Sequence, residues 1–296
     1  MKTLLKEFCK TINLESVGIA PAKPYLDFAR IWQQQIERKY NSGFEEKNFS
    51  KRVYPHLTLP AAKSVIVCLF PYFAGTDPEA NLAKFAYSLD YHLLIKDKLE
   101  TIGMFLQKQI TGFQYQSFVD NGPFSDRYLA FLAGLGFWGV NNHLICDKYG
   151  SYFFIGYILN NYPFPPDSPQ EKTCLQCGKC IEACPGQCIL GDFTINARRC
   201  KSYLTQKKDP LSATEVEIIQ KTALIWGCDV CQDVCPHNQN AVKSNLLEFT
   251  TNLVTRLDYQ ELKGLSNRAF KEKYKNRSFS WRGKKILLRN LEIIGS

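Results

Sequence analysis

Apolar and polar positions along the first 160 residues follow two different periods. A helical period, with apolar residues three or four positions apart, predicts helices over residues 2–13, 24–40, 78–109 and 125–133. Apolar runs predict strands over residues 64–70 and 152–159, and residues 114–119 are a further strand candidate that ends in the turn signal Asp120-Asn-Gly-Pro123. Residues 19–21 are expected to form a short turn. Helices interleaved with strands indicate an α/β domain with a mixed sheet.

A proline-rich stretch divides the chain. Residues 160–170 contain four prolines, and we place a domain linker there. The predicted division is an N-terminal α/β domain over residues 1–165, a cysteine-rich domain over residues 166–240 and a short basic helical segment over residues 241–296. The fold class expected for the whole chain is therefore α+β.

The positive charge of the chain is concentrated in its last segment. The net charge is +9, and in residues 241–296 twelve Lys and Arg stand against five Asp and Glu, a balance of +7. Such a segment suits a polyanion, and the rings of Phe270, Tyr274, Phe279 and Trp281 could stack on nucleic-acid bases. A solvated helix with a buried aromatic face explains the same pattern equally well.

No targeting or membrane-spanning segment is predicted. The N-terminus has neither a long apolar stretch nor a small-residue cleavage site, so it is not a signal peptide. The longest apolar runs are far too short to cross a bilayer. We therefore expect a cytoplasmic protein without a membrane partner.

Two closely spaced cysteine runs carry the strongest chemical signal. The first is Cys174-Leu-Gln-Cys177-Gly-Lys-Cys180-Ile-Glu-Ala-Cys184-Pro185, with the C-x2-C-x2-C-x3-C-P spacing of bacterial ferredoxins. The second is Cys228-Asp-Val-Cys231-Gln-Asp-Val-Cys235-Pro236, the same run without its first cysteine, and Cys200 is the candidate for the missing ligand. Eight thiolates in this pattern predict two [4Fe-4S] clusters in a ferredoxin-like domain.

Ligand crossing predicts which thiolate serves which cluster, because the cysteine before proline binds the other cluster in a two-cluster ferredoxin. Cluster 1 is therefore assigned Cys174, Cys177, Cys180 and Cys235, and cluster 2 is assigned Cys184, Cys200, Cys228 and Cys231. A pair of four-cysteine zinc sites is the alternative, disfavoured by the tight cysteine triple and both Cys-Pro endings. Two clusters in one small domain usually relay single electrons to a reactive centre.

The remaining motifs do not identify that centre. Gly134, Gly136 and Gly139 satisfy G-x-G-x-x-G but follow a predicted helix, so we interpret them as a tight turn. Asp90-Tyr91-His92 begins the D-x-H-x-x-G pattern of cobalamin proteins with a histidine axial ligand, but Ile95 stands where that pattern needs glycine. No flavin or nicotinamide motif is present.

Further segments carry a resemblance to a known family. They are Lys51-Arg52-Val-Tyr-Pro, Asp90-Tyr91-His92, Val119-Asp120-Asn-Gly-Pro, Ser125-Asp-Arg127-Tyr-Leu-Ala-Phe-Leu-Ala-Gly-Leu-Gly-Phe, Tyr149-Gly-Ser-Tyr, Ala197-Arg-Arg-Cys200-Lys-Ser202-Tyr-Leu-Thr, Gly227-Cys-Asp229-Val-Cys-Gln and Ser280-Trp-Arg-Gly-Lys-Lys. Together with the cysteine runs, this ordered set resembles the cobalamin-dependent epoxyqueuosine reductases of tRNA queuosine synthesis. Longer members continue into a helical repeat domain, so a short form is expected.

The resemblance implies a cobalamin bound base-off, without a histidine ligand, between the two domains. The implied reaction is two-electron removal of the epoxide oxygen of epoxyqueuosine at the tRNA wobble position, giving queuosine. Asp120 is the implied proton donor, assisted by Tyr91, and such a role at neutral pH requires burial to raise the pKa of the carboxyl. An Asp120 that caps its own turn is the alternative, and Asp126 is the rival carboxylate, more typical of a helix start.

The resemblance extends to binding residues and partners. Arg52, Asp120, Ser202 and Asp229 match segments that line the cobalamin, and Arg127 and Lys208 match positions near the tRNA backbone. The basic tail adds Arg282, Lys284 and Lys285 as candidate contacts with a tRNA anticodon stem-loop, although surface ion pairs would explain these charges as well. An external electron donor and a monomeric state are expected. Cys188 is an extra thiol near cluster 2, where the family usually has alanine.

Two other functions remain open at this point. A related cobalamin and iron–sulfur reductase of a small molecule, such as a reductive dehalogenase, would share the architecture but leave the basic C-terminal segment without a role. A ferredoxin-like electron carrier would need no 165-residue α/β domain and would usually be acidic.

Overall fold

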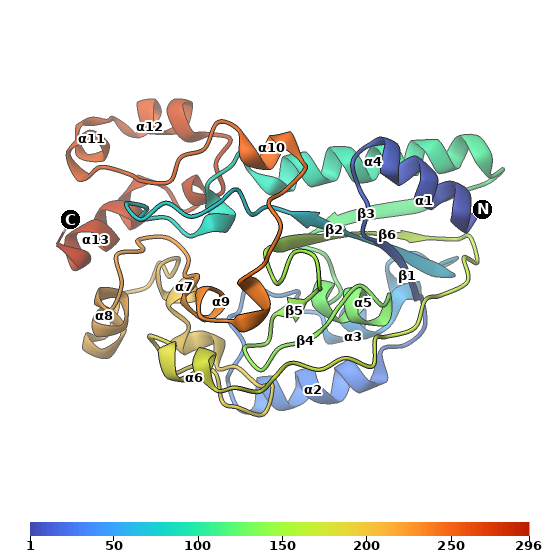
Figure 1. The fold of residues 1–296 in the computed structure, drawn as a ribbon, viewed down its shortest axis with the longest axis horizontal. Helices are drawn as coiled ribbons and strands as arrows, with labels where there is room; N and C mark the ends of the chain where they lie inside the picture. The colour runs from blue at the N-terminus through green and yellow to red at the C-terminus, as the bar shows by residue number, and fades with distance from the viewer. Residues whose placement is uncertain (296) are drawn as a thin grey trace.

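A four-stranded antiparallel sheet forms the centre of the computed structural model, which describes residues 1–295 (Figure 1). The strand order is β1 (Val17–Pro21), β2 (Ser64–Pro71), β6 (Phe153–Asn160) and β3 (Tyr115–Val119). The α+β class is confirmed, but the mixed sheet is wrong. β2 and β3 are parallel to each other and joined by a helical crossover, whereas β6 lies between them and runs opposite to both.

Each face of the sheet has its own hydrophobic core. All eight residues of β2 are buried, and successive side chains point to opposite faces. Ile66, Cys68 and Phe70 belong to the core shared with helices α1 (Lys2–Thr11) and α4 (Tyr91–Gln109). Val65, Val67 and Leu69 belong to the core shared with α2 (Leu26–Glu37) and α5 (Asp126–Leu132). Figure 1 shows these two pairs of helices on opposite sides of the sheet.

Two predicted boundaries are wrong because of backbone pairing that the sequence does not reveal. Residues 19–21 form the end of β1 rather than a turn, since Ile19 pairs with Ile66. The helix predicted over residues 78–109 begins only at Tyr91. Upstream of it, the N–H of Ala83 donates to the carbonyl of Trp226 at 2.9 Å, and Lys84–Ala86 form a single 3-10 turn, η2.

Short helices joined by loops make up the cysteine-rich region. They are α6 (Lys179–Ala183), η3 (Ala197–Arg199), α7 (Lys201–Leu204), α8 (Ala213–Gln220), α9 (Val230–Asp233) and η4 (Pro236–Asn238). The N-terminal region also contains α3 (Phe49–Val53), η1 (Pro55–Leu57) and the paired strands β4 (Phe137–Trp138) and β5 (Leu144–Ile145).

A polar network joins the cysteine-rich region to the sheet. The ammonium of Lys84 donates to Oδ1 of Asp233 at 2.6 Å, and the hydroxyl of Tyr152 donates to the same oxygen at 2.8 Å. The buried carboxylate of Asp229 accepts from the backbone N–H of Lys84 at 2.6 Å. The ammonium of Lys84 also lies 3.6 Å from the carboxylate of Asp229, and both side chains are buried. Because breaking a buried ion pair is costly, this network fixes the position of α9 against the sheet.

The C-terminal segment is helical, as predicted, and packs on the rest of the chain. It contains α10 (Leu247–Thr250), α11 (Tyr259–Gly264), α12 (Asn267–Tyr274), η5 (Ser278–Ser280) and α13 (Lys284–Ile294). Phe270, Tyr274 and Phe279 are buried in a core that includes Trp226, whereas Trp281 is 53% exposed. Three of the four rings proposed from the sequence to stack on bases are therefore core residues.

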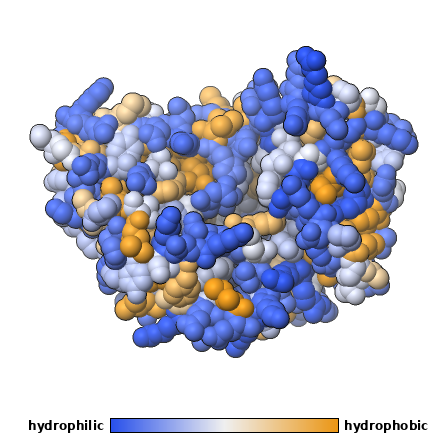
Figure 2. All heavy atoms as spheres, turned by 180° about the vertical axis from the view of Figure 1, so that it is seen from behind, coloured by the Kyte–Doolittle hydropathy of each residue, from blue (hydrophilic) through white to orange (hydrophobic). Residues whose placement is uncertain are grey.

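The surface is largely hydrophilic on the side opposite to the view of Figure 1. Figure 2 shows this side, which is hollowed near its centre. Among the helices of residues 1–295, none combines the length and the apolar character needed to cross a bilayer.

Candidate active site

Asp120 lies in the turn that follows β3. Its backbone has φ +56°, in the left-handed region, where Asp and Asn are tolerated better than most residues. The N–H of Asn121 donates to the carbonyl of Val119 at 2.6 Å, which closes the turn tightly. Asp120 therefore projects from the end of the edge strand, and its side chain keeps 55% exposure toward a large cavity.

Asp120 belongs to a hydrogen-bonded chain of four side chains. The hydroxyl of Tyr91 donates to Oδ2 of Asp120 at 2.6 Å, and Nε2 of His92 lies 3.4 Å from the same oxygen. On its other side, Nδ1 of His92 lies 2.8 Å from Oδ1 of Asp90. Asp90 is the N-cap of α4, so the first turn of this helix places Tyr91 and His92 beside the turn after β3.

The charges of this chain differ from the sequence prediction. Burial pushes the pKa of Asp120 upward, but hydrogen bonds from His92 and Tyr91 and the charges of His92 and Arg127 outweigh it, so the pKa is lowered. Burial likewise lowers the pKa of His92, but the carboxylates of Asp120 and Asp90 overcome this and raise it to about 9. The expected raised pKa of Asp120 is wrong. At neutral pH, His92 rather than Asp120 therefore carries the proton that the two side chains share.

Asp126 has the raised pKa that was expected of Asp120. Burial is the main cause, and the charge of Asp120 adds to it, against the opposing charges of Arg127 and Arg52. Oδ1 of Asp126 is buried and has no hydrogen-bond partner. Asp126 therefore holds its proton more strongly than an ordinary carboxyl, and it lies on the same cavity wall as Asp120.

The cavity beside Asp120 has a volume of about 1030 Å³, at the upper end of the range for small-molecule sites. Its walls come from the sheet, the loop over residues 42–47, the cysteine-rich region and the C-terminal segment. Five lining residues each carry a buried polar atom without a hydrogen-bond partner: Arg52, Asp126, Trp226, Ser278 and Arg282. Since buried polar groups are normally paired, this cluster fits a large ligand with many amide groups.

The residues predicted to bind cobalamin are only partly brought together. Arg52 lines the cavity, with its guanidinium 4.4 Å from the ring centre of Trp32, and Asp120 lines it as well. Ser202 and Asp229 are absent from the wall. Their segments nevertheless reach it, through Gln206 and Trp226, and one carboxylate oxygen of Asp229 is buried without a partner.

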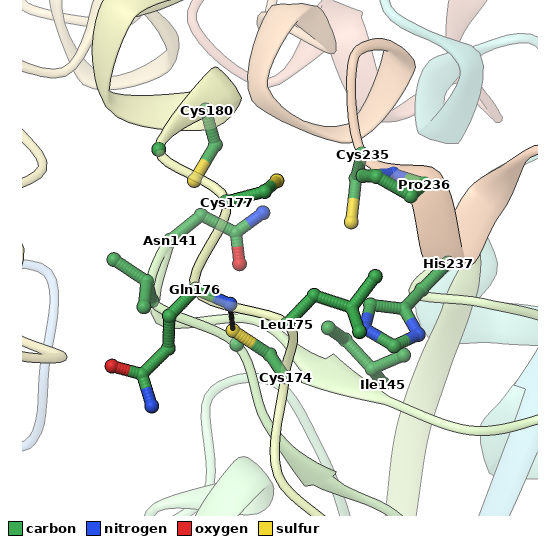
Figure 3. Close-up of a pocket in the computed structure, with 13 residues that line it drawn as sticks. Asn141, Ile145, Cys174, Leu175, Gln176, Cys177, Cys180, Cys235, Pro236 and His237 are labelled. Atoms are coloured by element: carbon green, nitrogen blue, oxygen red, sulfur yellow. Dashed lines mark hydrogen bonds between the residues drawn. The ribbon is translucent and has the colours of Figure 1, made fainter.

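The four cysteines assigned to cluster 1 line one small cavity, shown in Figure 3. Cys180 and Cys235 approach it from α6 and from the turn before Pro236, and Cys174 lies across from them. The N–H of Gln176 donates to Sγ of Cys174 at 3.3 Å. Within residues 1–295, no three thiol, imidazole or carboxylate groups converge on a single-ion position.

The four cysteines assigned to cluster 2 are also close neighbours. Burial, followed by the thiols of Cys200, Cys228 and Cys184, raises the pKa of Cys231. Cys188 lies in the same group, with its Sγ 3.3 Å from Sγ of Cys184. The cysteines thus form two separate groups, with Cys177 of the first group exposed to solvent.

The residues predicted to contact tRNA are dispersed. Arg127 and Arg282 line the cavity, and the guanidinium of Arg282 lies 3.6 Å from the ring centre of Trp281. Lys208 and Lys285 are exposed. The ammonium of Lys284 instead donates to the carbonyl of Leu265, so its charge is already engaged within the C-terminal segment.

Sequence reasoning missed the roles of Asp90 and His92. The available signal was the Asp90-Tyr91-His92 triplet, because an N-cap aspartate can bond a histidine two residues later on the first turn of a helix. The partner carboxylate of Asp120 lies 28 residues beyond His92, and only the pairing of β3 with the sheet brings the two together.

Two family models match the chain. One, described as "Epoxyqueuosine reductase QueG, DUF1730", covers residues 52–121, and the other, a "4Fe-4S double cluster binding domain", covers residues 173–238. An epoxyqueuosine reductase of Bacillus cereus is 36% identical over 294 residues, which cover 96% of this chain and 77% of that protein.

Solved structures agree with these matches. An epoxyqueuosine reductase with a tRNA-Tyr epoxyqueuosine-modified stem loop has a TM-score of 0.92 at 33% identity, covering 99% of this chain and 80% of that one. A Bacillus subtilis structure, with its catalytic aspartate loop swung out of the active site, has a TM-score of 0.91 at 33% identity and the same coverage. A reductive dehalogenase, at 16% identity and a TM-score of 0.50 over 80% of this chain and 32% of that one, is similar in fold alone.

Proposed function

The chain belongs to the epoxyqueuosine reductase family, and from this premise we propose that the cavity beside Asp120 binds cobalamin and receives the epoxide of a tRNA nucleoside. Removing the epoxide oxygen as water consumes two electrons and two protons and leaves a carbon–carbon double bond. The observation that carries the proposal is the chain of Tyr91, Asp120, His92 and Asp90 on the cavity wall, which can supply protons where the oxygen departs.

Cobalamin, when bound, supplies the electron pair that opens the epoxide. The unpartnered polar atoms of Arg52, Trp226 and Ser278 are suited to hold the amide side chains of such a macrocycle. His92 is the only one of the four histidines on the cavity wall. Both of its ring nitrogens face carboxylates and its raised pKa keeps it protonated, so it is not available as a cobalt ligand. This supports a cofactor without a histidine ligand, and the base-off state is proposed from the family resemblance.

Asp120 and His92 divide the work of proton transfer in this proposal. Asp120 faces the cavity, takes a proton from His92 and passes it to the departing oxygen, while Tyr91 holds the carboxylate in place. The imidazolium of His92, 3.4 Å from Asp120, is the store from which that carboxyl is reloaded. A positioned acid of this kind typically accelerates a reaction 10²–10⁴-fold.

The two cysteine groups are proposed to hold two [4Fe-4S] clusters, with the ligands assigned above. A cluster spreads its thiolates over several irons, which suits four cysteines around a cavity better than the tight tetrahedron of zinc. Cluster 1, with its exposed Cys177, is the entry point for an external electron donor. Cluster 2 lies between segments that supply Gln206 and Trp226 to the cavity wall, so it passes electrons onward.

The substrate is proposed to be the anticodon stem-loop of a tRNA that carries epoxyqueuosine. Arg127 and Arg282 lie at the cavity, and Lys208 and Lys285 are exposed and free to meet phosphates. In this proposal residues 1–165 bind the nucleoside and cobalamin, residues 166–240 carry the clusters, and residues 241–296 add tRNA contacts. We expect the protein to act as a monomer in the cytoplasm, where tRNA is modified.

An anaerobic single-turnover assay tests the proposal. Cluster-reconstituted protein, cobalamin and a chemical reductant are mixed with an anticodon stem-loop carrying epoxyqueuosine, and mass spectrometry identifies the product nucleoside. We expect loss of one oxygen, dependent on cobalamin and abolished in Asp120→Ala. Turnover that persists in Asp120→Ala but stops in Asp126→Asn would transfer the acid role to Asp126. No turnover with intact clusters and bound cobalamin would refute the proposed function.

A further inference from the structure

Cys188 is a buried thiol that the ligand assignment leaves unused. It is 2% exposed, and its Sγ lies 3.3 Å from Sγ of Cys184. Its backbone N–H donates to the same sulfur at 3.3 Å, and its thiol is also within hydrogen-bonding reach of Cys200. Cys188 therefore touches two residues that are assigned to cluster 2, from two different segments of the chain.

We propose that the thiol of Cys188 donates a hydrogen bond to the cluster 2 ligands and raises the reduction potential of that cluster. A thiol carries one S–H donor and no charge. Reduction adds negative charge to the cluster and its sulfurs, so a donor stabilises the reduced form more than the oxidised form. Cys188 is thus a positioning residue, and the inference relies on the proposed function only for the presence of the cluster.

A second feature of the same surroundings acts in the same direction. Lys201 follows Cys200 and is 1% exposed. Its ammonium donates to the carbonyls of Ile219 at 2.6 Å and Thr222 at 2.8 Å, and to the hydroxyl of Thr222 at 2.5 Å. All three acceptors are uncharged, so the positive charge near Cys200 is not cancelled by a carboxylate in direct contact. Negative charge on cluster 2 is favoured by this field.

The proposed effect of Cys188 favours electron transfer from cluster 1 to cluster 2. Cluster 1 has an exposed ligand, Cys177, while cluster 2 is flanked by segments that reach the cavity. By raising the potential of cluster 2, the donor thiol and Lys201 shift the distribution of electrons between the two clusters toward the one beside the cavity. An enzyme that needs two electrons, delivered singly, benefits from holding one there.

A redox titration of the holoprotein, monitored by electron paramagnetic resonance, tests this inference without any substrate. Wild type is compared with Cys188→Ala, which removes the donor, and with Cys188→Ser, which keeps one. Cys68→Ala is the matched control, because Cys68 is equally buried but lies in β2. We expect the midpoint potential of one cluster to fall in Cys188→Ala by up to about 59 mV, which corresponds to a tenfold change in the oxidised-to-reduced ratio. Cys188→Ser and Cys68→Ala should leave both midpoints in place.

Two results would overturn the inference. The first is a pair of midpoints in Cys188→Ala that match wild type. The second is loss of one cluster's iron in Cys188→Ala, which would make Cys188 a ligand rather than a donor. Cys188→Val, also without a donor but larger, repeats the test if the alanine variant does not fold. If wild type holds both clusters and one midpoint falls in Cys188→Ala, but wild type does not reduce epoxyqueuosine, only the proposed function is overturned.

Discussion

Replacing His92 by glutamine removes the proton store proposed for the active site while keeping a polar side chain at the start of α4. His92 is charged at neutral pH because the carboxylates of Asp120 and Asp90 raise its pKa from 6.5 to about 9, against the effect of burial. That rise corresponds to about 3 kcal/mol in favour of the protonated form. One third of the side chain is exposed to the cavity, so solvent screening reduces the net value to roughly 2 kcal/mol.

The sign of the effect on stability follows from the raised pKa. The stabilisation is fully present below pH 6.5 and is lost as the pH rises from 6.5 through about 9. In His92→Gln this loss of stability at alkaline pH should disappear, because glutamine does not titrate. Thermal unfolding of the cluster-loaded protein between pH 6 and pH 10 measures the difference.

The same variant changes the pH profile of catalysis. The single-turnover rate of wild type should stay level up to about pH 9 and then fall as His92 loses its proton. In His92→Gln, Asp120 must take its proton from solvent, and its pKa is lowered, so the fall should move several pH units toward acid. At pH 7.5 the rate should drop on the order of 10²-fold, as for removal of a general acid. His56→Gln, an exposed histidine outside the cavity, is the control. An alkaline fall that stays near pH 9 in His92→Gln would refute the proton-store role.

Three further predictions concern other parts of the molecule. Asp126→Asn should gain stability over wild type at pH 7 but not at pH 4, because a buried carboxyl with a raised pKa opposes folding increasingly as the pH rises; equal differences at both values would contradict this. Lys285→Ala should weaken binding of the anticodon stem-loop and lower the slope of log affinity against log salt by about 1, measured by fluorescence anisotropy; an unchanged slope would remove Lys285 from the interface. Lys84→Met should leave Asp229 and Asp233 without their cation and cost about 3–5 kcal/mol in urea unfolding of the holoprotein, whereas a loss below 1 kcal/mol would show that the network is not needed to hold α9.

Local patterns explain why the sequence points to cysteines that gather and to an Asp120 that follows a strand. Cys174, Cys177 and Cys180 are close in sequence, and a short loop must bring them to one cavity. Asp120 follows Phe118 and Val119, which favour a strand, and precedes the turn residues Asn-Gly-Pro, so its place at the end of a strand depends on its neighbours. In both cases the residues that decide the geometry lie within a few positions of one another.

Long-range contacts explain what the sequence could not predict. The pKa of Asp120 depends on His92, which approaches from the first turn of α4, and no periodicity along the chain encodes that meeting. The antiparallel sheet depends on β6 inserting between two strands that come before it in sequence. The sequence also does not reveal that one side of α12 is buried. Phe270 and Tyr274 have the same spacing in a helix that stacks on bases and in a helix that covers a core.

The left-handed backbone at Asp120 limits which amino acids can replace it, apart from any chemistry. At φ +56° a β-branched or bulky side chain strains the turn, whereas glycine and asparagine fit with little cost. A library randomised at this one position, selected first for folding, should therefore return mainly Asp, Asn and Gly. Selection for queuosine formation should then keep Asp alone. The two selections act on the same residue for independent reasons, one set by the backbone and the other by the proton that the carboxyl is proposed to transfer.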